Sequence, residues 1–392
     1  MKPLETDEAR LARTAIALRR QIHARPETAF EEIETAGLAA DRMRARGLAV
    51  RTRLGGTGVA ALLDTGRPGR TVLLRADLDA LPMAEGTGLP FAATNGKMHA
   101  CGHDGHVAAL DMAADLLLLD PPARGRIVFA FQPAEESTGG ATAMIADGVL
   151  EDPRPDVVFA VHLWTPLPLG TVGVAAGPMM AAVDEFRIEV TGRGGHAASP
   201  HETADTVLAA STVVQALQSI VSRRLPPLSP AVVSVASIHG GNAFNVLPDR
   251  VVLTGTCRSF DPDTVDALPG LVTGTAAAAA AVAGCGAQTT YIQKSRALVN
   301  DSGEAARASR CAAALVGERN VTADCRTMGG EDFSEFLRRI PGAFAFVGAA
   351  PASDPPGRRR THHAPDFDID ESALPVAARL LASFARSVLA GE

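Results

Sequence analysis

Apolar residues in the first part of the chain form short, nearly continuous runs, separated by segments with helical periodicity. Four of these runs have the length of strands: 59–63, 71–77, 126–133 and 156–163. Runs of this kind are typical of strands buried on both faces in an α/β sheet. The helical segments between and before them are 9–23, 31–46 and 107–119. We therefore predict an α/β sheet covered by helices.

The pattern changes near Val183. Residues 186–191 alternate between apolar and polar, as a half-exposed strand does. The segments that follow predict a helix at 204–222, strands at 231–240 and 250–260, a helix at 264–283 and a strand at 287–293. The order β-α-β-β-α-β is typical of a ferredoxin-like α+β sandwich. The α/β pattern then resumes, with a helix at 302–315, a strand at 343–349 and a helix at 371–389. We predict a discontinuous first domain, 1–182 and 296–392, with a second domain, 183–295, inserted into it.

Composition narrows the function classes. A chain of 392 residues is longer than one core usually holds, which agrees with two domains. The net charge of -7 argues against nucleic acid as a partner, because phosphate binding needs a basic face. No stretch approaches the roughly 18 apolar residues of a membrane span, and the first residues lack the apolar run of a secretory signal. We expect a cytoplasmic protein without a membrane partner, whose five cysteines are reduced.

Polar side chains follow three of the predicted strands. Asp77 and Asp79 come after one strand, Glu135 and Glu136 after the next, and His162 ends another. In open α/β sheets, ligands bind at the carboxyl ends of the strands. Adjacent carboxylates can divide the work there. Glu136 can bind a metal ion, while Glu135 takes a proton from water whose pKa the metal lowers to about 7.

The segment 97–106, KMHACGHDGH, adds sulfur and nitrogen ligands. It holds Cys101, His103 and His106, with His99 and Asp104 beside them. A Cys-x-His pair in extended backbone points both side chains to one face. Thiolate and imidazole are good ligands for zinc and similar divalent ions, so this cluster predicts a metal site.

Two further histidines lie near the C-terminus. His362 and His363 precede Pro365, which keeps this stretch extended. One of the two could complete the metal site, but the spacing does not decide which.

A set of segments spread along the chain resembles a known family. The segments are HARPETAFEE, LLRADLDALPM, GKMHACGHDGHVAAL, FQPAEE, VHLW, GRGGHAASPH, GGNAFNVLPD, GTCRSFD, MGGEDFSEF and HHAPDFDID. They resemble the M20 metallopeptidases, in the amidohydrolase branch that includes hippurate hydrolases, N-acyl-amino-acid amidohydrolases and plant auxin-conjugate hydrolases. The match runs from about His23 to Asp370, nearly the whole chain. It implies a metal-dependent exopeptidase-like catalytic domain and an inserted lid and dimerisation domain.

The resemblance implies two divalent metal ions per subunit, which could be Zn, Mn, Co or Ni. Cys101 takes the place of the bridging ligand, and the remaining ligands are His103, Glu136, His162 and His363. Glu135 resembles the general base. Asp79 resembles an aspartate that orients a liganding histidine. Asp104 and His106 belong to the motif but are not implied as ligands.

The inserted domain carries further implied roles. His196 resembles a residue that stabilises the oxyanion, often from a partner subunit. Asn245 and Arg258 resemble residues that hold the carboxylate of the substrate. Outside that domain, Gly329 and Gly330 would allow close approach of the backbone near the site. Many relatives have serine at the second of these positions, and we expect that difference to have a small effect.

The implied activity is hydrolysis of the amide bond of N-acyl amino acids, such as hippurate or N-acetyl amino acids. One alternative is a dipeptidase or carboxypeptidase with the same two-metal core. The Cys-x-His pair favours the amidohydrolase branch, because those peptidases resemble it but use a His-x-Asp pattern. A second alternative is a binding protein that retains the fold without activity, although Glu135 and all implied ligands are present. We also expect a homodimer through residues 183–295, with the strand at 186–191 pairing edge to edge with its copy.

Overall fold

The computed structural model describes residues 7–137, 139–351 and 360–391. The described residues fall into two compact units. The first comprises those of Met1–Gly177, Val299–Arg326 and Asp332–Glu392, and the second those of Pro178–Leu298 and Thr327–Glu331. The short segment 327–331, which the sequence groups with the first domain, is thus grouped here with the second.

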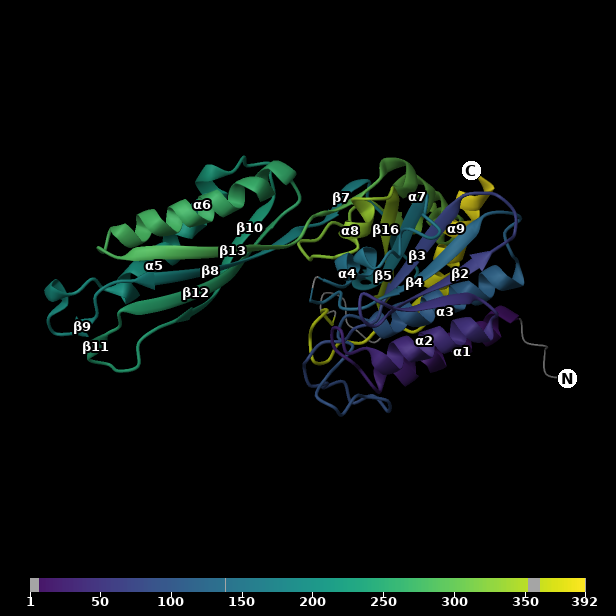
Figure 1. The fold of residues 1–392 in the computed structure, drawn as a ribbon, viewed down its shortest axis with the longest axis horizontal. Coiled ribbons are helices and arrows are strands. Elements are labelled where there is room, and N and C mark those ends of the chain that lie inside the picture. Colours follow the sequence, from purple (N-terminus) through teal and green to yellow (C-terminus); the bar gives the residue numbers. More distant parts are fainter. Residues whose placement is uncertain (1–6, 138, 352–359, 392) are drawn as a thin grey trace. The chain divides into compact units, whose positions relative to one another are not determined.

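The first unit contains one mixed sheet with helices packed on it (Figure 1). Its helices are α1 (Asp7–His23), α2 (Ile33–Ala45), α3 (His103–Leu119), α4 (Gly140–Ala146), α7 (Ser302–Val316), α8 (Ser334–Leu337) and α9 (Ala373–Ala390), with a 3-10 turn at Glu318–Asn320. Its strands are β1 (Ala49–Leu54), β2 (Gly58–Asp64), β3 (Thr71–Asp77), β4 (Arg126–Gln132), β5 (Val157–Pro168), β6 (Val172–Gly173), β15 (Val321–Thr322) and β16 (Gly342–Ala350). They lie in the order β1-β2-β4-β3-β5-β16-β6-β15.

The four central strands β4, β3, β5 and β16 run parallel to one another, and their neighbours on either side, β2 and β6, pair with them antiparallel. Every residue of β3 is buried. Strand β1 gave no signal in the sequence, because it has no continuous apolar run and its residues are mostly exposed.

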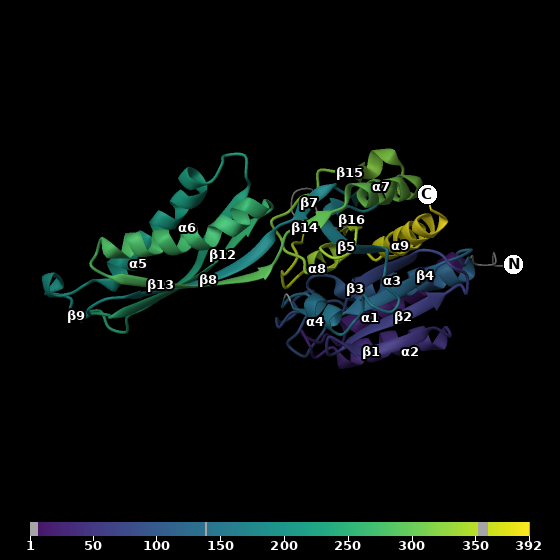
Figure 2. The same ribbon diagram turned by 45° about the horizontal axis from the view of Figure 1, so that its top comes forward.

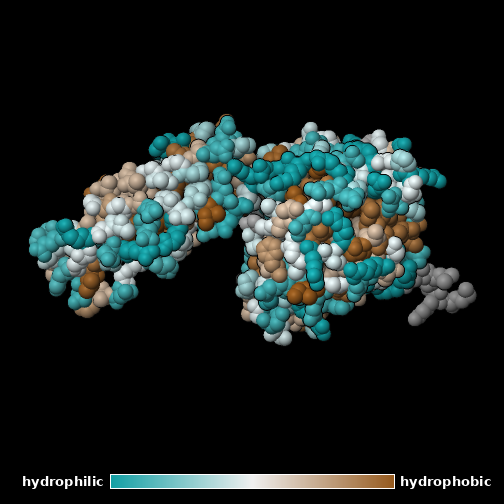
Figure 3. Space-filling view, viewed as in Figure 1, coloured by the Kyte–Doolittle hydropathy of each residue, from teal (hydrophilic) through white to brown (hydrophobic). Residues whose placement is uncertain are grey.

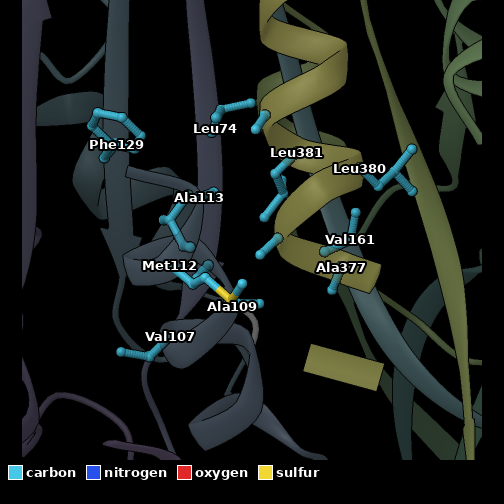
Figure 4. Close-up of a cluster of buried hydrophobic side chains, with 14 of the residues drawn as sticks. Leu74, Val107, Ala109, Met112, Ala113, Phe129, Val161, Ala377, Leu380 and Leu381 are labelled. Carbon is cyan, nitrogen blue, oxygen red and sulfur yellow. The ribbon is translucent and has the colours of Figure 1, made fainter. Parts of the chain in front are cut away.

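Helices α3 and α9 pack against each other and on the central strands. Their contact forms a cluster of buried hydrophobic side chains, in which Figure 4 shows Met112 of α3, Leu381 of α9 and Leu74 of β3. Phe159 of β5 stacks on Phe384 of α9 with ring centroids 4.0 Å apart. Of the described helices, α9 alone is long and apolar enough to cross a membrane, contrary to the expectation of no such stretch. Most of it is buried in this core.

The second unit is a four-stranded antiparallel sheet with two helices on one face (Figure 1, Figure 2). Its main elements are β8 (Ala182–Thr191), α5 (Thr206–Ser219), β10 (Ala231–His239), β12 (Arg250–Ser259), α6 (Pro262–Ala281) and β13 (Gly286–Ser295). Shorter elements are β9 (Gly195–His196), a 3-10 turn at Pro200–Glu202, a π-turn at Ile220–Arg224 and β11 (Val246–Leu247). The connecting strands β7 (Gly177–Met180) and β14 (Leu298–Asn300) pair with each other.

The strand order β10-β12-β8-β13, with this chain order, is that of a ferredoxin-like sandwich. The predicted fold class is therefore confirmed. The expectation that the strand at 186–191 lies at an edge is wrong. Strand β8 pairs with β12 on one side and β13 on the other along its length, so its backbone groups are already used.

The surface of the face shown in Figure 3 is mostly hydrophilic on both units, and hydrophobic residues form small separate patches. All five cysteines are buried and unbridged. Four of them thus behave as small packing residues, and Cys101 differs from them by its neighbours.

Candidate metal centre

Three parallel strands bring residues to the site. Strands β4, β3 and β5 are neighbours in the sheet, so their carboxyl ends lie at one edge. Asp77 is the last residue of β3, and His162 lies within β5. The loop before α3 supplies Cys101, and α3 begins at His103. Gly102 joins them with φ of 87°, a left-handed conformation that glycine adopts without strain.

The structure brings the five predicted ligands together. Donor atoms of Cys101, His103 and His162 lie within 4.8 Å of one another, and so do those of Cys101, Glu136 and His363. Cys101 belongs to both groups, as the resemblance implies for a bridging ligand. Its Sγ atom is 3.5 Å from His162 Nε2.

The chemistry of this donor set fits divalent metal ions. His103 Nε2 and Glu136 Oε1 are buried and have no hydrogen-bond partner among the described residues. Burial raises the pKa of the Cys101 thiol well above its usual range, and the carboxylates of Glu136 and Glu135 raise it further. Burial opposes the charged form of His103, but Asp77 and Asp79 outweigh it and raise the pKa of that imidazole to about 10. A cation would stabilise the thiolate and accept the lone pairs of these atoms.

The two C-terminal histidines differ in their surroundings. The His362 ring stacks on Trp164 at 4.4 Å between centroids, and its Nε2 lies 3.2 Å from the Leu163 carbonyl. Burial lowers the pKa of His362 to about 3. His363 has φ of 64°, and its amide donates to the Ala100 carbonyl at 2.8 Å. This backbone places His363 Nε2 at 3.3 Å from Glu136 Oε1. The geometry therefore puts His363, and not His362, in the donor set.

His106 is held in a structural role by both ring nitrogens. Its Nε2 accepts the Leu163 amide at 2.9 Å, so the proton is on Nδ1 and is donated to Asp77 Oδ1 at 2.5 Å. His162 donates from Nδ1 to the Leu163 carbonyl at 2.8 Å, which leaves its Nε2 facing Cys101. His106 thus fixes the backbone beside His162 and has no lone pair left for a metal.

Asp79 organises the turn that carries the two glutamates. Its Oδ1 accepts the amide of Glu135 and its Oδ2 the amide of Glu136, each at 3.0 Å. The Asp79 carbonyl accepts a hydrogen bond from His103 Nδ1 at 2.9 Å, which directs His103 Nε2 toward the other donors. Glu135 is 8% exposed and has a carboxylate oxygen within 4.8 Å of donor atoms of His103 and Glu136. This position suits a proton acceptor beside a metal ion.

A buried arginine in strand β3, Arg75, was not predicted from the sequence. Arg75 of β3 donates to Asp77 at 2.7 Å, to Gln132 at 2.9 Å and to Asp332 at 3.3 Å. Its charge offsets carboxylates that are 0–3% exposed. The signal that could have revealed it in the sequence is a charged residue, Arg75, inside the apolar run 71–77.

A second cluster, of buried charged and polar side chains, fixes the position of the first turn of α3. Asp104 accepts from Arg19 Nε at 2.8 Å and lies 2.7 Å from His23 Nδ1. Burial raises the pKa of Asp104, but these two groups outweigh it and hold that pKa well below its usual range. Asp104 therefore anchors the helix that begins with His103, which agrees with its absence from the implied ligands.

In the second unit, His196 and Asn245 lie together. His196 of β9 pairs with Val246 of β11, and the Ala197 amide donates to the Asn245 carbonyl at 3.1 Å. Both side chains are exposed. Figure 1 shows β9 and β11 beyond one end of the four-stranded sheet.

Arg258 lies near the other end of that sheet. It is eight residues along β12 from Arg250, roughly 26 Å at about 3.3 Å per residue, and Arg250 is at the end toward β11. The structure thus does not bring Arg258 and Asn245 of one subunit together. Arg258 Nε donates to Thr256 Oγ1 at 3.1 Å, and the Thr256 hydroxyl donates to the Asp184 carbonyl at 2.7 Å.

Gly330 lies against the side chains of Val183 and Arg258. A Cβ atom on Gly330 would collide with Val183 and would lie 3.4 Å from Arg258 Nη1. A serine here would therefore force Val183 to move, which is more than the small effect expected from the sequence.

Comparisons with known proteins agree with this site. Residues 73–387 match the model of peptidase family M20/M25/M40. The chain is 39% identical over 381 residues to N-acetyl-L-cysteine deacetylase of Bacillus subtilis (strain 168), covering 97% of this chain and 89% of that protein. It is 38% identical over 380 residues to IAA-amino acid hydrolase ILR1-like 4 of Arabidopsis thaliana, covering 95% and 85%.

A solved structure of Bacillus subtilis YXEP protein, described as a dinuclear metal binding peptidase from the M20 family, is also similar. Its TM-score is 0.83 at 32% sequence identity, covering 97% of this chain and 99% of that one. These findings confirm the family expected from the sequence. The chain belongs to peptidase family M20/M25/M40, and it is a hydrolytic enzyme.

Proposed function

We propose that this enzyme hydrolyses the amide bond of N-acyl amino acids, of the hippurate or N-acetyl-amino-acid type, and releases a carboxylic acid and a free amino acid. The observation that carries the proposal is the donor set around Cys101, with the Glu135 carboxyl beside it. The names of the two relatives, a deacetylase of N-acetyl-L-cysteine and a hydrolase of IAA-amino acids, support this substrate class.

The donor set would hold two divalent ions, and Zn, Mn, Co or Ni suits a thiolate with imidazoles and a carboxylate. One ion would bind Cys101, His103 and His162, and the other Cys101, Glu136 and His363. When bound, such a pair polarises the scissile carbonyl and lowers the pKa of water.

The protein side chains then handle the protons. Glu135 takes the proton of the attacking water and passes it to the leaving amine, acting first as base and then as acid. Asp79 keeps Glu135 in place through its backbone amide. His196 donates a hydrogen bond to the oxyanion that develops on the carbonyl.

Arg258 holds the carboxylate of the substrate. Its Nε is used by Thr256, and no described residue accepts a hydrogen bond from its two Nη groups, which can form a fork on a carboxylate. This contact explains why the proposed substrates carry a free carboxylate next to the scissile amide.

A substrate panel tests the proposal. Chelator-treated enzyme receives Zn, Mn, Co or Ni and is assayed on N-acetyl amino acids, N-benzoyl amino acids and dipeptides. We expect kcat/KM for the best N-acyl amino acid to exceed that for dipeptides by about 100-fold. The matching carboxamide, which lacks the carboxylate, should be cleaved roughly 10- to 100-fold less well, since a charged hydrogen-bonded pair contributes about 1.5–3 kcal/mol.

Arg258→Ala is the matched variant for this panel, because it should remove the difference between acid and carboxamide. A clear preference for dipeptides would support a peptidase instead. Metal binding without cleavage of any amide in the panel would contradict the function.

We also propose that the enzyme is a homodimer formed through the second unit. In one subunit, Arg258 and His196 lie toward opposite ends of the same sheet, so a small substrate cannot contact both. Two subunits can bring them to one site, with His196 supplied by the partner. Edge strand β10 offers a pairing surface, with Ile238 exposed on it and Val207 and Leu208 exposed on α5, which packs against β10.

Light scattering at micromolar protein should therefore give the mass of a dimer. Complementation gives a sharper test, because His196→Ala and Glu135→Ala subunits should each be inactive alone. Unfolding and refolding them together should restore roughly a quarter of wild-type activity, since half of the dimers are mixed and each has one intact site. A monomer in solution would contradict the proposal. If mixed dimers recovered no activity, His196 would act within its own subunit.

A further inference from the structure

Three consecutive backbone amides, those of Ala134, Glu135 and Glu136, each donate a hydrogen bond to a buried carboxylate. Glu32 Oε1 accepts the amide of Ala134 at 2.8 Å. Asp79 accepts the next two amides, those of Glu135 and Glu136. Glu32 is 102 residues away from Ala134 in the sequence, at the start of α2.

The Glu32 carboxylate is fully enclosed. It is 0% exposed, and its Oε1 also accepts the Phe30 amide at 3.0 Å. Its Oε2 accepts the Thr57 hydroxyl at 2.5 Å. A buried carboxylate is unfavourable unless its oxygens are hydrogen-bonded, and these donors supply those bonds. The side chain is therefore held rigidly in one position.

Ala134 is in a conformation that needs such support. Its φ is 53°, in the left-handed region, and the residue is fully buried. A residue with a Cβ atom persists there only when its surroundings hold it. The backbone conformation of Ala134 sets the direction in which Glu135 and Glu136 leave strand β4.

We infer that Glu32 is a positioning residue of the active site: its carboxylate holds Ala134 in the left-handed turn that aims Glu135 and Glu136 together at the metal ions. Among the described residues, the Glu32 carboxylate hydrogen-bonds Phe30, Thr57 and Ala134 and none of the donor set, so it acts through the backbone. The kinetic part of this inference rests on the proposed function, whereas its effect on metal binding does not.

Glu32→Ala tests the inference. We expect kcat to fall about 100-fold with KM changed less than about threefold, because the base is misplaced while the substrate contacts remain. Affinity for Co²⁺, measured by competition with a chelator, should weaken roughly 10-fold through Glu136. Glu32→Gln keeps the oxygen that accepts the two amides, so it should retain at least about half of kcat and of the Co²⁺ affinity.

Glu27→Ala is the matched control. The Glu27 carboxylate accepts the amides of Glu34 and Thr35, each at 2.9 Å, in the first turn of α2. Its loss should lower Tm as Glu32→Ala does, because it frees backbone amides in the same segment. It should leave kcat and Co²⁺ affinity within about twofold of wild type, since among the described residues its carboxylate hydrogen-bonds only these two amides of α2.

Equal losses of kcat and Co²⁺ affinity in Glu27→Ala and Glu32→Ala would overturn the inference, because Glu32 would then only stabilise the fold. So would unchanged kcat and affinity in Glu32→Ala. If the wild type cleaves nothing in the substrate panel, the proposed function fails, and the Co²⁺ comparison still decides the role of Glu32.

Discussion

Replacing Glu135 with glutamine should lower kcat by about 10³- to 10⁴-fold while both metal ions stay bound. Glutamine keeps the shape of the side chain, and the backbone amide of residue 135 still donates its hydrogen bond to Asp79. It cannot accept the proton of the attacking water, and general acid–base catalysis typically contributes 10²- to 10⁴-fold. The measurement is kcat on the best N-acyl amino acid, with metal content determined by elemental analysis.

Glu136→Gln is the control for this experiment. The two glutamates are neighbours in one turn, and Asp79 accepts the amides of both. Glu136 belongs to the donor group with Cys101 and His363, so its variant should lose metal together with activity. If Glu135→Gln instead turned over substrate at more than about a tenth of the wild-type rate, Glu135 would not be the base.

Cys101→Ser should weaken binding of both metal ions by about 100-fold or more and abolish turnover at ordinary metal concentrations. Cys101 is the one residue shared by the two donor groups that form the proposed sites. A serine hydroxyl stays protonated at neutral pH and does not supply the negative charge of a thiolate. Two measurements follow this change: metal affinity by chelator competition, and the thiolate absorption band of the Co²⁺ form.

Cys311→Ser is a matched control. Cys311 is 8% exposed and Cys101 is 9% exposed, and both lie in the first unit. Cys311 is in α7, outside the donor groups, so its variant should bind metal like the wild type. Retention of two tightly bound ions by Cys101→Ser would contradict the assignment of Cys101 as a shared ligand.

Much of the fold could be read from local patterns. The runs at 71–77, 126–133 and 156–163 are apolar on both faces, and the structure shows them as the buried central strands β3, β4 and β5. The carboxyl ends of neighbouring parallel strands lie at one edge of the sheet, so polar residues at these ends come close together. For this reason the sequence alone groups Glu136 with His162.

Other features depend on partners far apart in the chain. Strand β8 looks half exposed because one face is solvated, but alternation does not show whether its edges are paired, and both are. The order of strands in a sheet is decided by packing between distant segments. The edge-to-edge pairing expected for β8 was wrong for this reason.

The sequence by itself determined the fold class, the family and a set of thiol, imidazole and carboxylate groups suited to divalent metals, because these follow from periodicity and from residue type. Only the tertiary structure decided how each group is used. His363 joins the donors because its left-handed backbone turns it toward Glu136, while His362 stacks on Trp164. Glu32 reaches the Ala134 turn across 102 residues of sequence. Hydrogen bonds between such distant groups depend on where the folded chain places them, and no local pattern of polar and apolar residues records that.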